Sequence, residues 1–245
     1  RCSEPAAGWH SYLLFTDIEG STQLWEAHPE EMRTALQQHD TVLREAIEAQ
    51  GGYVFKTIGD AFCAVFAAAP DALKAALEAQ HALLAMQTTA EGQLALRVRM
   101  ALHTGAAEFR NNDYFGQPLN RVVRLLAAGH GWQVLLSNVA YDLGRGRVPA
   151  ESTLKSLGEH WLRDLAYPEP VFQLCHPDLP DDFPVLKSAS ASSIPNNLPL
   201  QVTSFVGREK ALDDVSQQLV ITRLLTLTGS GGAGKTRLSL RAAGV

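Results

Sequence analysis

The chain is poor in cysteine, in positive charge and in long apolar segments, and each shortage excludes a class of protein. Its formal net charge of −5 argues against broad binding of nucleic acids or of anionic membranes. No apolar run approaches the roughly 18 residues that a membrane-spanning helix needs. The few cysteines are odd in number and lack metal-ligand spacing, which makes a reducing cytoplasm the simplest location: they are Cys2, Cys63 and Cys175.

Hydrophobic residues form 46% of the 245 residues, enough for one large domain or for one domain plus a fragment. The chain begins with Arg1 rather than Met, which leaves open whether residues precede it.

The expected elements are, in order, a strand (12–17), a short helix capped by Ser21 or Thr22 (to about 28), a helix (29–50), a hairpin (53–57 and 61–67), a helix from 70, a strand (96–103), a turn (111–113), a helix (118–128) and strands at 134–136, near 161 and at 171–174. This order predicts an α+β fold, a ferredoxin-like βαββαβ sandwich with helices on one face of an antiparallel sheet.

The composition changes after the last of these strands. Five prolines surround a serine- and alanine-rich stretch, which is typical of a linker. After this linker we expect a helix and then a β-rich run at 224–228. The predicted domain organisation is a domain at 1–176 with its core at 11–175, a linker at 177–199 and a further segment at 200–245.

Two acidic residues follow strand-like runs beside glycine: Asp17 in FTDIEGST (15–22) and Asp60 in KTIGD (56–60). Two carboxylates can hold cations that neutralise a nucleotide triphosphate, and Mg²⁺ needs only one or two protein carboxylates besides phosphate oxygens. Lys56 offers a donor for a base. Taken singly, Asp17 more commonly caps a helix and Asp60 more commonly occupies a hairpin turn. The pair and its surroundings favour nucleotide chemistry.

A second group of polar residues surrounds the helix expected at 118–128. Asn120 and Arg124 are four residues apart and therefore share a helix face, whereas Arg121 points elsewhere. An arginine there can clamp phosphate oxygens, and the asparagine amide can orient a ribose. Asp113, in the preceding loop, can accept a hydrogen bond from an exocyclic amine. The alternative is a solvated helix face with a surface ion pair.

The third motif is GSGGAGKT (229–236), which fits the Walker A pattern and follows the β-rich run. Backbone donors between Gly229 and Gly234 can cradle phosphates, Lys235 can reach the terminal ones and Thr236 can hold Mg²⁺. Together with SFVGRE (204–209) this segment resembles the opening of a regulator-type signal-transduction P-loop ATPase. Because the sequence ends at Val245, we expect a fragment of such a domain that hydrolyses nothing by itself.

Residues from about 11 to 175 resemble the catalytic domain of class III adenylate and guanylate cyclases. The matching stretches are FTDIEGST (15–22), KTIGD (56–60), HTG (103–105), YFGQPLNRVVR (114–124) and QVLLS (133–137). The resemblance implies roles for eight residues: metal binding by Asp17, Ile18 and Asp60, reading of the base by Lys56 and Asp113, transition-state stabilisation by Asn120 and Arg124, and triphosphate binding by Arg163. The last assignment rests on a looser motif, in which arginine replaces lysine. His103 is better interpreted as a structural histidine than as a catalytic one.

The base-reading pair predicts the substrate. Lysine supplies only donors and an ionised aspartate only acceptors, which matches N1 and the N6 amine of adenine. Guanine has the reverse polarity at these positions. Lys56 and Asp113 therefore favour ATP over GTP. The resemblance also implies a homodimer, in which the metal-binding aspartates of one subunit meet the base-reading and transition-state residues of the other.

The leading hypothesis is a cytoplasmic adenylate cyclase that converts ATP to 3′,5′-cyclic AMP and pyrophosphate with two Mg²⁺ or Mn²⁺ ions per site. We expect it to be a homodimer that binds neither membranes nor nucleic acids. The alternative is a weakly active or inactive cyclase-like domain that binds nucleotides and regulates an attached ATPase. A third reading makes the P-loop the working site of the chain.

Overall fold

The computed structural model describes residues 11–89, 94–163, 165, 167–187, 211–212, 214–215, 218–219, 222, 224–230 and 234–243. The chain divides into two compact units, Arg1–Ser188 and Ala189–Val245. Among the described residues, no helix is both long and apolar enough to cross a membrane.

The first unit is built on a seven-stranded sheet with the order β2-β3-β1-β4-β7-β9-β8. The strands are β1 (Ser11–Ile18), β2 (Tyr53–Ile58), β3 (Ala61–Phe66), β4 (Val98–Gly105), β7 (Val134–Ser137), β8 (Thr153–His160) and β9 (Glu169–Cys175). Neighbouring strands are antiparallel except β4 and β7, which run parallel. The prediction of an α+β fold is confirmed, but the purely antiparallel sheet was wrong because helix α4 (Gln117–Ala128) returns the chain for β7 to enter beside β4 in the same direction.

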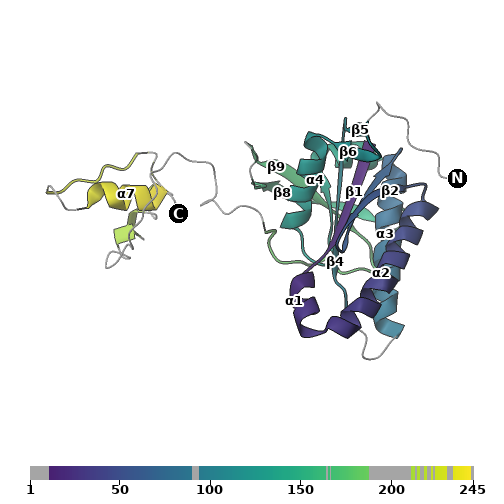
Figure 1. Cartoon of the computed structure of the whole chain (residues 1–245). Coiled ribbons are helices and arrows are strands. Elements are labelled where there is room, and N and C mark those ends of the chain that lie inside the picture. Colours follow the sequence, from purple (N-terminus) through teal and green to yellow (C-terminus); the bar gives the residue numbers. More distant parts are fainter. Residues whose placement is uncertain are drawn as a thin grey trace. The chain divides into compact units, whose positions relative to one another are not determined.

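Helices cover both faces of this sheet, which also differs from the prediction. Helices α2 (Pro29–Ala49), α3 (Ala69–Thr89) and α5 (Asn138–Gly144) pack on one face, where side chains such as Leu14, Met100 and Leu136 meet them. Helix α4 packs on the other face, against Leu13 and Leu135. Figure 1 shows α2 and α3 on one side of the strands and α4 on the other. Successive strand residues point to opposite faces, so neighbours such as Leu13 and Leu14 serve different cores.

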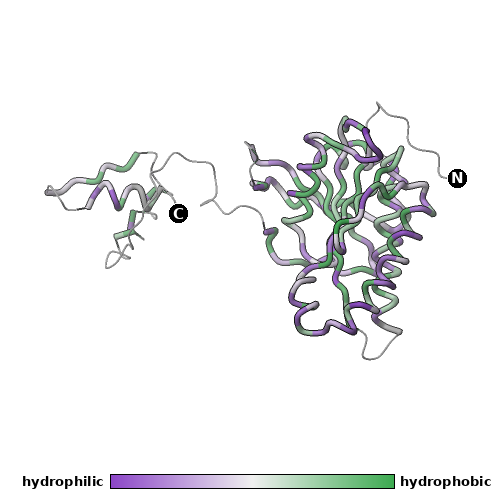
Figure 2. The backbone as a smooth tube through the Cα atoms, in the orientation of Figure 1, coloured by the Kyte–Doolittle hydropathy of each residue, from purple (hydrophilic) through white to green (hydrophobic). Residues whose placement is uncertain are grey.

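The distribution of hydropathy explains why both faces are covered. The tube in Figure 2 is mostly hydrophobic along the strands, while α2 alternates between hydrophobic and hydrophilic residues. The four residues from Leu13 to Thr16 in β1 are all buried, as are the five from Phe62 to Phe66 in β3. A strand that is apolar on both sides must be packed on both sides, so α4 supplies the second layer.

Three local features were not predicted. Strands β5 (Glu108–Arg110) and β6 (Asp113–Phe115) form a separate hairpin around the expected turn. Helix α5 is capped by Ser137, whose hydroxyl accepts a hydrogen bond from the Ala140 N–H. Helix α1 (Ser21–Ala27) is preceded by Gly20 with φ 74°, without a side-chain cap, so the expected capping by Ser21 or Thr22 was wrong.

Residues 177–187, which were predicted as the start of a linker, belong to the first unit and pack within it. Leu186 is buried among the residues of the α4 face. The Lys187 N–H donates to the Ala128 carbonyl over 2.8 Å, and a ring nitrogen of His130 lies 3.1 Å from the Val185 carbonyl. The proline content of a stretch indicates only its local backbone preference. It could not predict these contacts, because they join residues far apart in the sequence.

The second unit has one complete helix among its described residues, α7 (Lys235–Ala243). The run at 224–228, predicted to be β-rich, is irregular. The SFVGRE segment at 204–209 and the greater part of the predicted linker, 188–199, lie outside the described residues.

Candidate active site

Two of the predicted metal-binding residues meet at one end of the central strands. Asp17 is in β1, and Asp60 is in the turn between β2 and β3. β1 and β3 pair antiparallel with Phe15 opposite Cys63, and continuing that register brings Asp17 level with the residue after Asp60. The Asp60 carboxylate accepts a hydrogen bond of 3.1 Å from the Ile18 N–H. The fold therefore gathers two carboxylates and the backbone of Ile18 in one place.

Arg99, which the sequence did not single out, contacts Asp17. It lies opposite Asp17 in the β1–β4 pairing, and its Nε and Nη2 both donate to Asp17 Oδ2, over 2.9 and 2.6 Å. The two side chains are 21% and 26% exposed, so this pair is partly shielded from water. Its signal in the sequence was the polar position of Arg99 in an alternating strand, which specifies a face but not a partner.

Glu19 anchors the loop that follows the Asp17 strand. Its carboxylate accepts from the Gly131 N–H over 3.1 Å, lies 3.5 Å from the Arg97 guanidinium and also accepts from the Lys187 ammonium. Burial of Glu19 acts to raise its pKa, but the hydrogen bonds from Lys187 and Gly131 and the nearby positive charges outweigh burial and hold that pKa below its usual range. The charged Glu19 side chain, two residues after Asp17, thus connects the segments that contain Gly131, Arg97 and Lys187.

The predicted base-reading residues are in direct contact. Lys56 on β2 donates to the carboxylate of Asp113 at the start of β6. The other Asp113 oxygen accepts from the Tyr114 N–H over 2.8 Å. The hydrogen bond with Asp113 raises the pKa of Lys56. The aromatic rings of Phe55 and Phe109 each lie 4.9 Å from that of Tyr114, and this cluster holds the β5–β6 hairpin against β2.

The predicted transition-state residues lie on α4. This helix buries Val122 and Leu125 against the sheet, and Pro118 lies in its first turn. Asn120 is exposed and Arg124 is half-buried. Arg121 instead forms an ion pair of 3.0 Å with Glu169. The expectation that Arg121 differs from its neighbours therefore agrees with the helix geometry.

Arg163 and His103 lie on other elements: Arg163 follows β8, and His103 is in β4. Arg163 is exposed in a turn after β8. His103 is buried in β4, with Nδ1 2.7 Å from the Ser137 hydroxyl. Burial, assisted by the charge of Arg121, lowers the pKa of His103 to about 4. A neutral buried histidine that bonds the N-cap of α5 supports a structural role.

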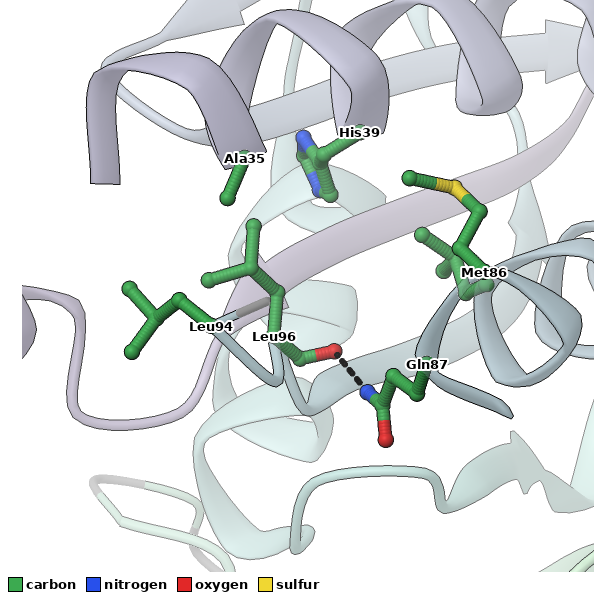
Figure 3. A pocket seen from close by; sticks show the side chains of 7 residues that line it. Ala35, His39, Met86, Gln87, Leu94 and Leu96 are labelled. Atoms are coloured by element: carbon green, nitrogen blue, oxygen red, sulfur yellow. Dashed lines mark hydrogen bonds between the residues drawn. The ribbon is translucent and has the colours of Figure 1, made fainter. Parts of the chain in front are cut away.

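A small pocket between α2 and α3 is distinct from the aspartates. Figure 3 shows His39 projecting from α2 toward this space, with Met86 on the opposite side and Gln87 bonded to the Leu96 carbonyl, a contact of 3.4 Å. His39 is fully buried. Its Nδ1 lies 2.9 Å from Asp40, and burial lowers its pKa. The lining is mainly apolar, so this space offers nothing for a triphosphate.

In the second unit, the described part of the Walker A segment folds back on itself. The Lys235 ammonium donates to the carbonyls of Gly229 and Ser230, over 2.8 and 2.7 Å. Gly229 and Gly234 have positive φ values of 152° and 70°, which favour glycine. Thr236 is the second residue of α7.

The first unit matches the family model of the adenylate and guanylate cyclase catalytic domain over residues 10–166. The chain belongs to this family. It is 44% identical to an uncharacterized protein of Mycobacterium tuberculosis over 198 residues, which are 80% of this chain and 66% of that protein. It is 34% identical over 148 residues to an adenylate cyclase of Schizosaccharomyces pombe, covering 51% of this chain and 9% of that one. The chain therefore spans less than two thirds of the length of these relatives.

Solved cyclase structures are similar to this chain, in agreement with the family match. A structure of adenylate cyclases from Trypanosoma brucei in their monomeric state superimposes with a TM-score of 0.64 at 28% identity, over 74% of this chain and 95% of that chain. An adenylate/guanylate cyclase/hydrolase structure from Silicibacter pomeroyi superimposes with a TM-score of 0.62 at 25% identity, over 69% of this chain and 98% of that chain. The prediction of a class III cyclase catalytic domain is confirmed, and with it the cyclase-like α+β fold.

Proposed function

We propose that this chain is an adenylate cyclase. The 3′-oxygen of ATP attacks the α-phosphorus, the bond from that phosphorus to the β-phosphate oxygen breaks, and pyrophosphate leaves. The hydroxyl proton passes to solvent, because none of the groups described at the site is needed as a base. The observation that carries the choice of ATP is the contact between Lys56 and Asp113, which presents a donor and an acceptor side by side.

The donor set at Asp17 and Asp60 fits Mg²⁺ or Mn²⁺. Two carboxylates and the nearby Ile18 carbonyl are all oxygen ligands, which such cations prefer. Two ions per site would neutralise the triphosphate and make the 3′-hydroxyl more acidic. The hydrogen bond from the Ile18 N–H fixes one Asp60 oxygen and leaves the other for coordination.

Arg99 connects this set to the triphosphate. In the structure, its Nε and Nη2 both donate hydrogen bonds to the Asp17 carboxylate. Asp17 would hold a cation through the carboxylate that Arg99 contacts here. The guanidinium of Arg99 would then be available to donate to phosphate oxygens, for which its planar fork is suited. We assign Arg163 the same kind of contact, on the weaker ground of its place in the family motif.

The Lys56–Asp113 pair supports a preference for ATP over GTP. The lysine donor faces the N1 acceptor of adenine, and the aspartate accepts from the N6 amine. Guanine places a donor at N1 and an acceptor at O6, so each contact becomes a mismatch. An unpaired buried donor or acceptor costs about 1–3 kcal/mol, so two mismatches disfavour GTP strongly.

The site is completed by a second copy of the chain. Asn120 and Arg124 of one subunit approach the substrate held at Asp17 and Asp60 of the other, where Arg124 stabilises the charge that develops on the α-phosphate. Exposed apolar side chains support a covered surface here. Val123, between these two residues, is 50% exposed, and Ile58, beside Asp60, is 60% exposed.

Complementation tests this arrangement. Asp17→Ala and Arg124→Ala are each expected to abolish production of cyclic AMP, while their mixture recovers activity because one intact composite site forms. Arg121→Ala is the matched control on the same helix, since Arg121 pairs with Glu169, and it should stay active. If the mixture gains nothing although both variants are folded and dimeric, the shared site is wrong.

A second candidate is a cyclase-like regulator of an attached ATPase. The link between Lys187 and Glu19 favours it, because it ties the last described part of the first unit to the metal-binding loop. In this reading the segment from Gly229 to Thr236 opens a P-loop domain, with Lys235 and the Gly234 backbone on phosphate. Turnover of ATP and GTP with Mg²⁺ and with Mn²⁺ separates the candidates: nucleotide binding without any turnover favours the regulator.

A further inference from the structure

Two histidines and an aspartate that are not among the residues proposed for catalysis lie together in the fold. His81 lies on α3, His176 directly follows β9, and Asp178 lies in the next turn. Their ligand atoms all lie within 4.8 Å of one another. Among the described residues this is the one group of three such side chains in that range. It belongs to the α2–α3 face of the sheet, not to the α4 face.

The spacing of the two ring nitrogens corresponds to a tetrahedral ion. His81 Nε2 and His176 Nδ1 are 3.3 Å apart. Two nitrogens bound at about 2.0–2.1 Å to a tetrahedral Zn²⁺ are separated by about 3.3–3.4 Å. The Asp178 carboxylate is 3.7 Å from His176 Nδ1, a few tenths of an ångström too far, but this side chain is 77% exposed and can move inward.

The existing hydrogen bonds do not fully satisfy this cluster. Nδ1 of a neutral histidine has one lone pair. In His176 that atom already lies 3.2 Å from the Asp178 N–H, which donates to it. If His81 Nε2 carries a proton, two donors compete for one lone pair, and if it does not, two lone pairs face each other. A cation bound by both rings removes the conflict, and the Asp178 N–H, in an exposed turn, is then hydrated.

The ligand types also suit a transition metal. Imidazole nitrogens with one carboxylate suit Zn²⁺, whereas Mg²⁺ takes oxygen ligands.

We propose that His81, His176 and Asp178 bind Zn²⁺ or a similar transition-metal ion, with water in the fourth position. The ion joins the middle of α3 to the end of β9. It differs from the cations proposed at Asp17 and Asp60 in ligand type and in location. The site therefore acts as a structural clip, and its occupancy does not depend on whether the chain is a cyclase.

Calorimetric titration of the chelator-treated full chain with Zn²⁺ alone tests the proposal. One equivalent of the Zn²⁺ that the native chain binds should be lost in His81→Gln and in His176→Gln. It should be retained in His28→Gln, a matched change at an exposed histidine. Asp178→Asn should weaken binding of this equivalent. Because Asp178 is exposed, a loss there is not attributable to misfolding. Zn²⁺ should raise the Tm of the native chain and of His28→Gln, and this shift should vanish in the two ligand variants.

Two results overturn the proposal. One is equal Zn²⁺ stoichiometry in the native chain and in both histidine variants. The other is binding that Asp17→Asn removes while His81→Gln retains it, because the ion then occupies the carboxylate pair. Neither result bears on cyclase activity, which is measured with nucleotide and Mg²⁺, so failure of this proposal and failure of the proposed function are distinguishable.

Discussion

Replacing Leu186 by alanine tests whether residues 177–187 are part of the folded domain. The sequence there reads as a linker, yet Leu186 is 6% exposed, while its neighbour Val185 is 84% exposed. A linker would tolerate both replacements equally. A packed segment would be sensitive at Leu186 alone, so the adjacent pair is a matched comparison within one backbone.

The expected magnitude follows from burial. Truncating a buried leucine to alanine costs about 2–5 kcal/mol, and the lower end applies at an edge where the surroundings can close in. We therefore expect Leu186→Ala to lower the free energy of unfolding by about 2–3 kcal/mol. For a domain of this size that corresponds to roughly 5–10 °C in Tm. Val185→Ala should change the free energy of unfolding by less than about 0.5 kcal/mol, because its contact with His130 uses the backbone carbonyl.

Urea unfolding followed by tryptophan fluorescence measures this difference. All four tryptophans, at positions 9, 25, 132 and 161, lie in the first unit, so the signal reports on that unit alone. The reasoning is refuted if Leu186→Ala is as stable as the native chain, or if Val185→Ala loses as much stability. The first result would show that residues 177–187 contribute no packing, and the second would contradict the difference in burial between the two side chains.

Three further predictions concern the same unit. Gly52→Ala should lower Tm by several degrees because the added Cβ would lie 2.5 Å from the Phe66 ring, whereas Gly146→Ala, with nothing within 4 Å, should not; thermal melts compare them. The pKa of His103 is about 4 when folded, so the unfolded state, near 6.5, binds the proton first. The free energy of unfolding should fall by up to about 3 kcal/mol as pH drops from about 6.5 to about 4, and His103→Gln should flatten this slope in urea titrations. Burial raises the pKa of Cys63 to about 11, so a thiol reagent at pH 8 should label it only after unfolding, as read by peptide mass spectrometry; rapid labelling of the native chain contradicts its burial.

Residues in short motifs could be predicted because the chemistry is encoded locally. The FTDIEGST and KTIGD segments contain both the strand ends and the acidic residues, so the positions of Asp17 and Asp60 at strand ends followed from the sequence. The contact between Lys56 and Asp113 joins residues 57 apart. It followed from the family resemblance rather than from spacing.

Contacts made by the fold could not be predicted in this way. Arg99 meets Asp17 from 82 residues away, and Glu19 meets Gly131 from 112 residues away. An alternating strand shows that Arg99 is polar on one face, but its partner depends on which strand lies alongside. The parallel entry of β7 beside β4 likewise depends on topology. In contrast, the start of α5 had a signal in Ser137, a residue type that commonly caps helices.

We infer that the proposed chemistry belongs to the α4 face of the sheet, and this assignment can be measured. The α2–α3 face has the larger apolar core and the His81–His176 cluster. The α4 face has Tyr114, next to Asp113, and the helix on which Asn120 and Arg124 lie. Changes on the first face should alter Tm and leave the ratio of ATP to GTP turnover constant, because they do not touch the base-reading pair. Changes at Lys56 should alter that ratio with little effect on Tm, since this side chain is 45% exposed and its ion pair adds little stability. A variant of the α2–α3 core that changed nucleotide preference without unfolding would show that the two layers are coupled through the strands they share.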